Sequence, residues 1–292
     1  MEHFLPEKIK CAAIVSPAGK PDQAELEQGI FFLEKCGIQV KVMPHAFGSK
    51  NTTFPYLAAT DQERAADFTE AYLDKDVDII FASRGGYGCG RILPLLNWEK
   101  LKKAPPKIVA GYSDLTSLFF AMTAKNCGTP LASIMAAKLW SCGQRELLGI
   151  FDACSKTKKF FTLDVIKAGK ANGTILAGNL TVAASCIGTE YMPDVQNKIL
   201  VFEEIGEDPY RIDRLFNQLK LSGTLSRCAG VIAGHFTGCP DDILKEILTD
   251  YSRHINGPVL ADYAYGHEMP FDSLLYGTPA IISDNTFTVN AE

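Results

Sequence analysis

The chain has 292 residues, of which 47% are hydrophobic and 22% charged, so it can form a hydrophobic core and differs from a disordered segment. This length fits one large domain or two of ordinary size, and we expect two. The net charge is −5 and no run of lysine and arginine occurs, which excludes nucleic acid and anionic membranes as partners and favours a small molecule.

Nine cysteines are scattered without a C-x-x-C pair, which predicts reduced, mostly buried thiols and neither a disulfide scaffold nor a zinc site. Residues 1–8 are acidic and interrupted by Pro6, unlike a secretory signal. The longest apolar runs are strand-sized, far below the roughly 20 residues of a membrane span. We therefore expect a cytoplasmic protein.

The first part of the chain alternates apolar, β-rich runs with segments of helical spacing, which predicts an α/β fold with a parallel sheet covered on both faces. Ligands of such sheets bind beyond the carboxyl ends of the strands. The expected strands are 9–15, 38–42, 77–82 and 108–111, and the expected helices are 22–36, 61–73 and the segment after Ser113.

From residue 141 to 169 the pattern loosens, which places a domain boundary there. We expect an N-terminal α/β domain at 1–145, a linker at 146–170 and a more β-rich C-terminal domain at 171–292. In the second domain the predicted strands are 173–176, 198–202 and 231–234, and the predicted helix is 211–221.

The glycine-rich segment 83–91 directly follows a predicted strand, and its glycines allow backbone N–H groups to approach a ligand. It is not a dinucleotide-binding sequence, because Arg91 stands where the third glycine of G-x-G-x-x-G belongs, and no Walker sequence follows. The segment alone leaves open a ligand-binding loop and a tight strand-to-helix connection.

Ser113 lies between a predicted buried strand and a predicted helix, the layout of a nucleophile elbow. The G-x-S-x-G pattern of α/β-hydrolases is not met, since Leu115 stands at its last glycine. Taken alone, the local sequence fits a helix N-cap better than a nucleophile.

Two adjacent carboxylates, Glu203 and Glu204, end another predicted strand. Neighbouring residues of a strand face opposite ways, so only one of them can point into a given site, and we expect the other to be solvated or ion-paired.

A catalytic base has to come from the five histidines of the chain. His267 lies in a late loop, and His235, which also follows a predicted strand, is its main rival; the others are His3, His45 and His254. No pair has the spacing of a metal site, so we predict neither a metal nor another cofactor.

Several motifs in one order, spread over nearly the whole chain, resemble the LD-carboxypeptidases, serine peptidases that also include the microcin C immunity peptidases. The motifs lie at 56–65, 84–88, 111–114, 177–180, 203–214 and 266–267. The resemblance implies that Ser113 is the nucleophile, Glu203 the acidic member of the triad and His267 the base. It also implies a homodimer that cleaves the bond between the L-centre of a diamino acid and a terminal D-alanine in murein tetrapeptides.

In the mechanism we expect, Ser113 forms an acyl-enzyme, and the N–H groups of Gly86 and Asp114 hold the oxyanion. Arg84 is a candidate for binding the free carboxylate of the substrate, with a structural ion pair as the alternative.

The chain departs from the family at 132–134, just before Met135, and at His235, and we expect both places to line the substrate cleft. Two other functions remain open. One is a peptidase of the same chemistry that acts on a peptidyl-nucleotide antibiotic and needs aromatic side chains over the cleft. The other is a protein that binds a small ligand without turnover.

Overall fold

The computed structural model describes residues 5–290, and within this range the strands form two sheets. The N-terminal sheet has the strand order β12-β5-β4-β3-β1-β2, and β1 to β5 are parallel neighbours. Its strands are β1 (Cys11–Val15), β2 (Gln39–Val42), β3 (Ile79–Ala82), β4 (Ile108–Gly111), β5 (Thr129–Ala132) and β12 (Leu274–Leu275).

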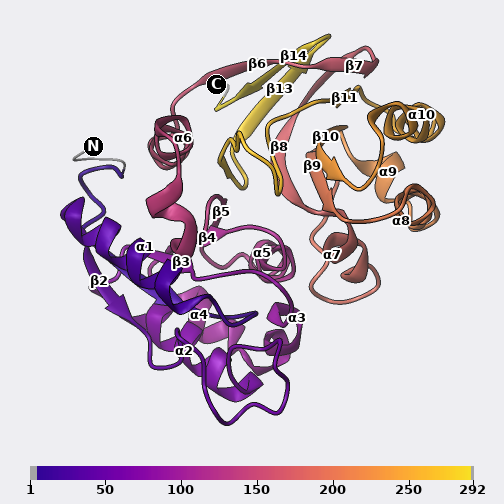
Figure 1. The fold of residues 1–292 in the computed structure, drawn as a ribbon. Helices are drawn as coiled ribbons and strands as arrows, with labels where there is room; N and C mark the ends of the chain where they lie inside the picture. Colours follow the sequence, from indigo (N-terminus) through magenta and orange to yellow (C-terminus); the bar gives the residue numbers. More distant parts are fainter. Residues whose placement is uncertain (1–4, 291–292) are drawn as a thin grey trace.

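Helices cover the N-terminal sheet, and β1 and β3 are buried along their whole length. The helical segments are α1 (Gln23–Lys35), α2 (Asp61–Leu73), α3 (Cys89–Ile92), η1 (Leu93–Leu95), α4 (Trp98–Lys103), α5 (Leu115–Ala124), η2 (Ala136–Ser141) and α6 (Gln144–Ser155). This half forms the indigo-to-magenta lobe of the molecule (Figure 1).

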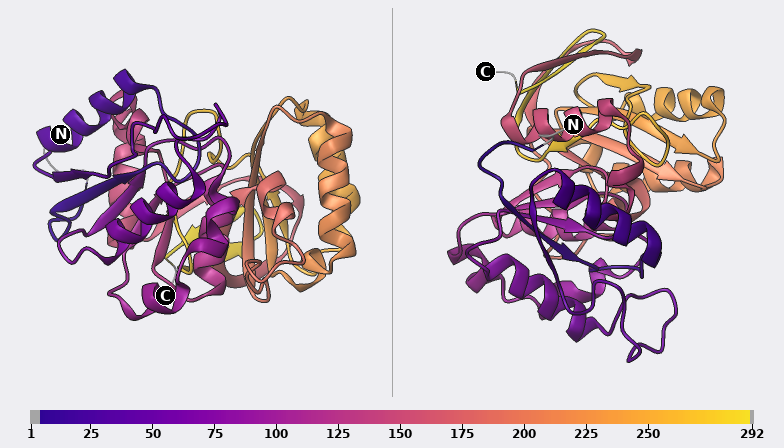
Figure 2. Two further views of the ribbon diagram at one scale, coloured as in Figure 1. Left: turned by 90° about the horizontal axis from the view of Figure 1, so that it is seen from below. Right: turned by 60° about the vertical axis from the view of Figure 1, so that its left-hand side comes forward.

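The second sheet has the order β6-β14-β13-β8-β9-β10-β11-β7, in which only β8 to β11 are parallel neighbours. Its strands are β6 (Lys159–Thr162), β7 (Asp164–Lys167), β8 (Lys170–Asn179), β9 (Lys198–Ile205), β10 (Gly230–Thr237), β11 (Val259–Ala261), β13 (Pro279–Ser283) and β14 (Thr286–Val289). The helices are α7 (Leu180–Ser185), α8 (Pro209–Leu221), α9 (Thr224–Arg227) and α10 (Asp241–Ser252). Figure 2 shows this second lobe beside the first.

The expected fold class, a parallel-sheet α/β half followed by a more strand-rich half, is confirmed. Residues 146–170, which we expected to be a linker, contain most of α6 together with β6 and β7, the two edge strands of the second sheet. In the described part of the chain no helix is long and apolar enough to cross a bilayer. His3 lies outside the described residues.

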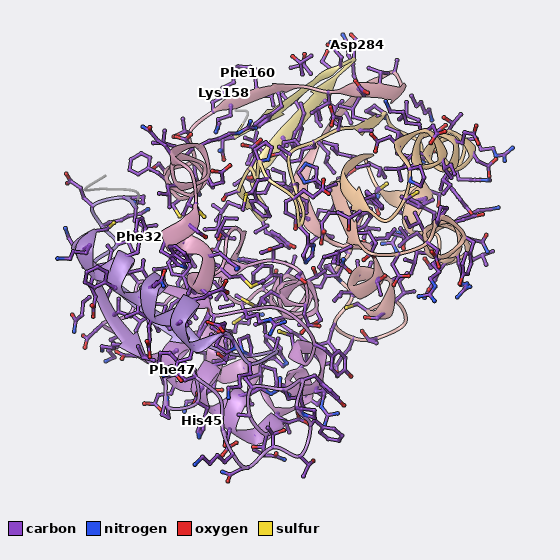
Figure 3. The ribbon with its side chains drawn as sticks, viewed as in Figure 1. Phe32, His45, Phe47, Lys158, Phe160 and Asp284 are labelled. Carbon is purple, nitrogen blue, oxygen red and sulfur yellow. The ribbon has the colours of Figure 1, made fainter. Side chains whose placement is uncertain are left out.

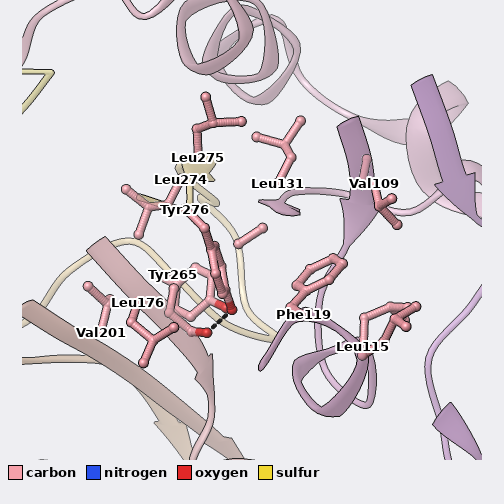
Figure 4. Close-up of a cluster of buried hydrophobic side chains, with 14 of the residues drawn as sticks. Val109, Leu115, Phe119, Leu131, Leu176, Val201, Tyr265, Leu274, Leu275 and Tyr276 are labelled. Atoms are coloured by element: carbon pink, nitrogen blue, oxygen red, sulfur yellow. Dashed lines mark hydrogen bonds between the residues drawn. The ribbon is translucent and has the colours of Figure 1, made fainter. Parts of the chain in front are cut away.

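The two lobes share one hydrophobic core. Phe119, Leu131 and Tyr276, the residue after β12, belong to the N-terminal lobe and meet Leu176 of the second sheet (Figure 4). The Tyr276 hydroxyl donates a hydrogen bond to the carbonyl of Ala177. Polar contacts of this kind fix the position of the lobes more strictly than apolar packing alone, because a hydrogen bond depends on direction.

Tyr276→Phe should lower the free energy of unfolding by about 1 kcal/mol, because it removes one buried hydrogen bond and keeps the ring. Urea denaturation followed by far-UV circular dichroism measures the change. Tyr56→Phe is the matched control, since Tyr56 is 50% exposed, and it should unfold at the wild-type midpoint. Equal midpoints for wild type and Tyr276→Phe would contradict the expectation.

Candidate active site

Ser113 lies on a tight turn between β4 and α5, with a positive φ of 63°. Such a conformation is uncommon for a residue other than glycine and is typical of strained functional turns. The N-cap of α5 is Asp114, so the interpretation of Ser113 as a simple helix cap is wrong. The turn is held by the N–H and the hydroxyl of Thr116, which donate to the Ser113 carbonyl at 2.9 and 2.7 Å.

Glu203, His267 and Ser113 form a continuous chain of contacts. Nδ1 of His267 lies 2.7 Å from Oε2 of Glu203, and Nε2 lies 3.2 Å from Oγ of Ser113. Glu203 is fully buried near the end of β9. A neutral imidazole that donates from Nδ1 to the carboxylate leaves the lone pair of Nε2 free to accept the serine proton. The arrangement can therefore activate Ser113 as a nucleophile.

Tyr112 packs against the side of the His267 ring, and the centroids of the two rings are 5.0 Å apart. Phe271 in turn packs against Tyr112 with a centroid distance of 5.1 Å. Burial raises the pKa of Tyr112 to about 12, with the charge of Glu203 as a further cause, so its hydroxyl stays neutral. Tyr112 therefore supports the imidazole as a neutral aromatic surface.

Gly266 allows the loop of His267 to approach β9. Its φ is 140°, and a Cβ there would lie 3.0 Å from the Cβ of Glu203. A larger residue would have to push the loop away from the carboxylate, which explains the glycine before His267.

Glu204 points to the other side of β9, as the alternation of a strand requires. We expected the carboxylate outside the site to be solvated or ion-paired, and this is wrong: Glu204 is only 2% exposed and its partners are neutral. It accepts hydrogen bonds from the side chain of Asn179 at 2.8 Å and from the N–H of Thr181 at 2.7 Å. Glu204 thus stabilises the start of α7.

The other described histidines lie away from Ser113. His45 is in the N-terminal lobe with its Nδ1 2.9 Å from a carboxylate oxygen of Asp67 (Figure 3). His254 packs against Tyr251 at the end of α10. His235 is in β10 and lines a different cavity from the one at Ser113.

The glycine loop passes directly over Ser113. The N–H of Gly19 donates to the Gly85 carbonyl at 3.0 Å, and a Cβ on Gly85 would lie 3.2 Å from the Ser113 hydroxyl oxygen. Within residues 5–290 the N–H groups of Gly86 and Asp114 have no hydrogen-bond acceptor. Both amides are available for a ligand.

The side chain of Asp114 is turned away from this space. Its carboxylate accepts the N–H of Cys89 at 2.8 Å, and burial raises the pKa of the carboxyl group. Arg64, also buried, donates to the carbonyl of Pro17 in the loop after β1 and to that of Gly88 in the glycine loop, and so ties these two loops together.

Ser113 and His267 open into a cleft of about 490 Å³ between the glycine loop and the end of β9. Other side chains that line it are Asp22, Glu25, Arg84, Met135, Lys138 and Ile205. Neither departure from the family, at 132–134 or at His235, lines the cleft, contrary to our expectation; Met135, the methionine that follows the first of them, does. Among the described residues no group of three or more His, Cys, Asp or Glu side chains could bind a metal ion.

Comparison with known proteins agrees with the resemblance of the motifs. The LD-carboxypeptidase N-terminal domain matches residues 12–133, and the LD-carboxypeptidase C-terminal domain matches residues 172–282. The fold and these matches define a peptidase. The chain belongs to the LD-carboxypeptidase family.

Individual relatives cover almost the full chain. A Bacillus subtilis protein named "Probable murein peptide carboxypeptidase" is 32% identical over 92% of this chain and 88% of its own length. The murein tetrapeptide carboxypeptidase of Pseudomonas aeruginosa is 27% identical over 94% of this chain and 93% of its own. The crystal structure of muramoyltetrapeptide carboxypeptidase from Oxalobacter formigenes is 26% identical, with a TM-score of 0.85, and covers 97% of this chain and 99% of that one.

Gly85→Ala should slow the reaction of Ser113 with a fluorophosphonate by about 10²-fold, because the added methyl group displaces the hydroxyl from His267. Mass spectrometry of the labelled serine over time measures the rate. Gly90→Ala is the control, because a Cβ at this position would meet only one atom, at 3.9 Å. The labelling rate of Gly90→Ala should equal that of wild type. An unchanged labelling rate of Gly85→Ala would contradict the expectation, because it would show that the glycine loop can shift to accommodate the methyl group without displacing Ser113.

Proposed function

We propose that this protein is a serine carboxypeptidase that hydrolyses the amide bond between the L-centre of a diamino acid and a terminal D-alanine in murein tetrapeptides. The observation that carries the proposal is the contact chain from Glu203 through His267 to Ser113 in the wall of the cleft. Membership of the LD-carboxypeptidase family supports the substrate class.

In the first step His267 takes the proton of Ser113 at Nε2 while the serine oxygen attacks the carbonyl carbon of the scissile amide. Buried Glu203 holds the imidazole in one tautomer and stabilises the imidazolium that forms. The negative charge that develops on the carbonyl oxygen is bound by the free N–H groups of Gly86 and Asp114.

The tetrahedral intermediate then breaks its C–N bond, and His267 gives its proton to the departing nitrogen, so that D-alanine leaves as a neutral amine. Water next attacks the acyl-enzyme, with His267 again accepting the proton, and Ser113 is released. The shortened peptide leaves with a new carboxylate.

Arg84 is the group that we propose binds the carboxylate of the terminal D-alanine. It is exposed in the cleft wall, and one guanidinium nitrogen donates to the carbonyl of Lys20 at 2.9 Å. No carboxylate of the described residues pairs with it, so the remaining donors of the fork can bind a substrate carboxylate.

The cleft favours a peptide over a peptidyl-nucleotide. Tyr112 is the aromatic ring among its described lining residues besides His267, and it already packs against that imidazole. The nucleobase of a peptidyl-nucleotide would need a free aromatic side chain on which to stack.

We also infer a cytoplasmic homodimer. The nine cysteines all lie within the described residues and form no disulfide, all but Cys142 are buried, and burial raises the pKa of every thiol, which suits a reducing compartment. The dimer rests on the family resemblance, and sedimentation at micromolar concentration tests it.

Ser113→Ala should lower the rate of D-alanine release from a murein tetrapeptide by about 10⁴-fold or more, because no other group can form the acyl-enzyme. A coupled D-amino-acid oxidase assay measures the release. Ser226→Ala, on the exposed surface, is the control and should retain full activity.

Wild type that releases no D-alanine, or Ser113→Ala that keeps full activity, would refute the proposal. A protein that only binds ligand would instead show tight binding of the tetrapeptide without turnover, and His267→Ala would leave that binding unchanged. Isothermal titration with both proteins separates the two functions.

A further inference from the structure

A second histidine lies beside the buried carboxylate of the site. In the pairing of β9 with β10, Phe202 faces Ala233 and Glu204 faces Phe236, so Gly234 and His235 together stand opposite Glu203. This is a β-bulge, a feature that redirects side chains and is common next to functional sites. His235 therefore adjoins Glu203.

The loop that carries His267 packs on both residues. The N–H of His235 donates to the carbonyl of Tyr265 at 2.8 Å. The position of a Cβ on Gly266 would be 3.0 Å from the Cβ of Glu203 and 3.1 Å from that of His235. The two side chains thus leave the backbone on either side of the same glycine, within reach of each other.

Each of these side chains has one buried polar atom without a partner. Within the described residues Oε1 of Glu203 and Nδ1 of His235 are buried and make no hydrogen bond. Leaving such groups unsatisfied is costly, above all for a carboxylate, and native proteins satisfy nearly all of them. One is an acceptor and the other can be a donor, so the two can satisfy each other.

His235 also borders a cavity. The residue lines a cavity of about 480 Å³, and its side chain is partly exposed although Nδ1 is buried. Four carboxylates also line this cavity, those of Asp164, Asp241, Asp262 and Glu268, with Lys245 paired to Asp164 at 2.7 Å. Water there can donate to Nε2, which places the proton of a neutral ring on Nδ1.

We propose that His235 is a positioning residue for Glu203: its Nδ1–H is the hydrogen-bond donor, direct or through one water molecule, that holds Oε1. With Oε1 held, the carboxylate cannot rotate, and Oε2 stays on Nδ1 of His267. The inference rests on the proposed function, because it assigns His235 a part in the same triad without contact to the substrate. It also gives a purpose to the departure of this chain from its family at position 235.

A pair of amide variants tests the inference. The side-chain nitrogen of asparagine lies near the place of Nδ1 in histidine, whereas the longer glutamine reaches the place of Nε2. His235→Gln should therefore lower kcat for tetrapeptide hydrolysis about tenfold or more, with KM unchanged within about twofold, as loss of a hydrogen bond to a charged group predicts. His235→Asn should retain kcat within about threefold of wild type, because it restores the donor.

A purely structural role for His235 predicts a different result, in which kcat follows the thermal stability of the variants and asparagine, which fills less space, is the worse substitute. Thermal unfolding is measured for both proteins. If His235→Asn loses as much kcat as His235→Gln, or if neither loses any, the inference is wrong.

The rate of Ser113 labelling by a fluorophosphonate gives a readout that does not depend on the substrate. In this reaction the serine oxygen forms a bond to phosphorus, fluoride leaves and His267 accepts the proton. The labelling rate should fall in His235→Gln and be restored in His235→Asn, with Glu203→Gln as the positive control. Suppose that the wild-type protein is labelled by the fluorophosphonate but does not hydrolyse tetrapeptides. The proposed substrate is then wrong, and the ratio of the labelling rates of wild type and His235→Gln still tests the role of His235.

Equal labelling rates of wild type and His235→Gln would overturn the inference. A wild-type protein that is not labelled would overturn both the inference and the proposed function.

Discussion

The distance between Ser113 and His267 depends on the buried contact between the two lobes. The serine belongs to a turn of the N-terminal sheet, Glu203 belongs to β9 of the second sheet, and His267 lies in the loop from β11 to β12, so no local backbone geometry sets the 3.2 Å contact of Ser113 with His267. The shared hydrophobic core brings the lobes together, and hydrogen bonds between them set the position of one lobe relative to the other, because hydrogen bonds depend on direction. Thr116 is central, because its hydroxyl donates to the Ser113 carbonyl and accepts the N–H of Asn179 at 2.9 Å from the other lobe. One side chain thus links the nucleophile turn to the strand beside Glu203.

A backbone conformation of low intrinsic stability lies where the lobes meet. Ser113 and Gly266 both have positive φ, and for a residue such as serine this costs on the order of 1–3 kcal/mol. The surrounding structure has to supply that free energy. Arg64 fixes the glycine loop through the carbonyl of Gly88, and the N–H of Cys89 in that loop donates to the carboxylate of Asp114, so that the glycine loop and the serine turn support one another.

Local signals in the sequence predicted the elements that local interactions determine. Helix α2 spans residues 61–73 as expected, and its start is fixed by the capping box of Thr60 and Glu63. The two lobes were predicted from the alternation of strands and helices. Motifs and family resemblance singled out Ser113, Glu203 and His267, which the structure brings into contact. Their contact was not visible locally, since it joins residues 64 and 154 positions apart. The burial of Glu204, the bulge at His235 and the strands in 146–170 were missed for the same reason: each depends on pairing with a distant segment.

Strand β12 has a consequence for how the cleft can move. It comes from near the end of the chain, yet it pairs with β5 in the N-terminal sheet. The chain therefore crosses between the lobes before β6 and returns to the first lobe at β12, so the lobes are tied at separated points. A hinge rotation would have to distort each of these crossings at once and open the shared hydrophobic core, and the width of the cleft is consequently set by the fold. Ligands are then selected by how well they fit a preformed space, and they enter and leave through movements of exposed rim side chains such as Arg84 and Ile205.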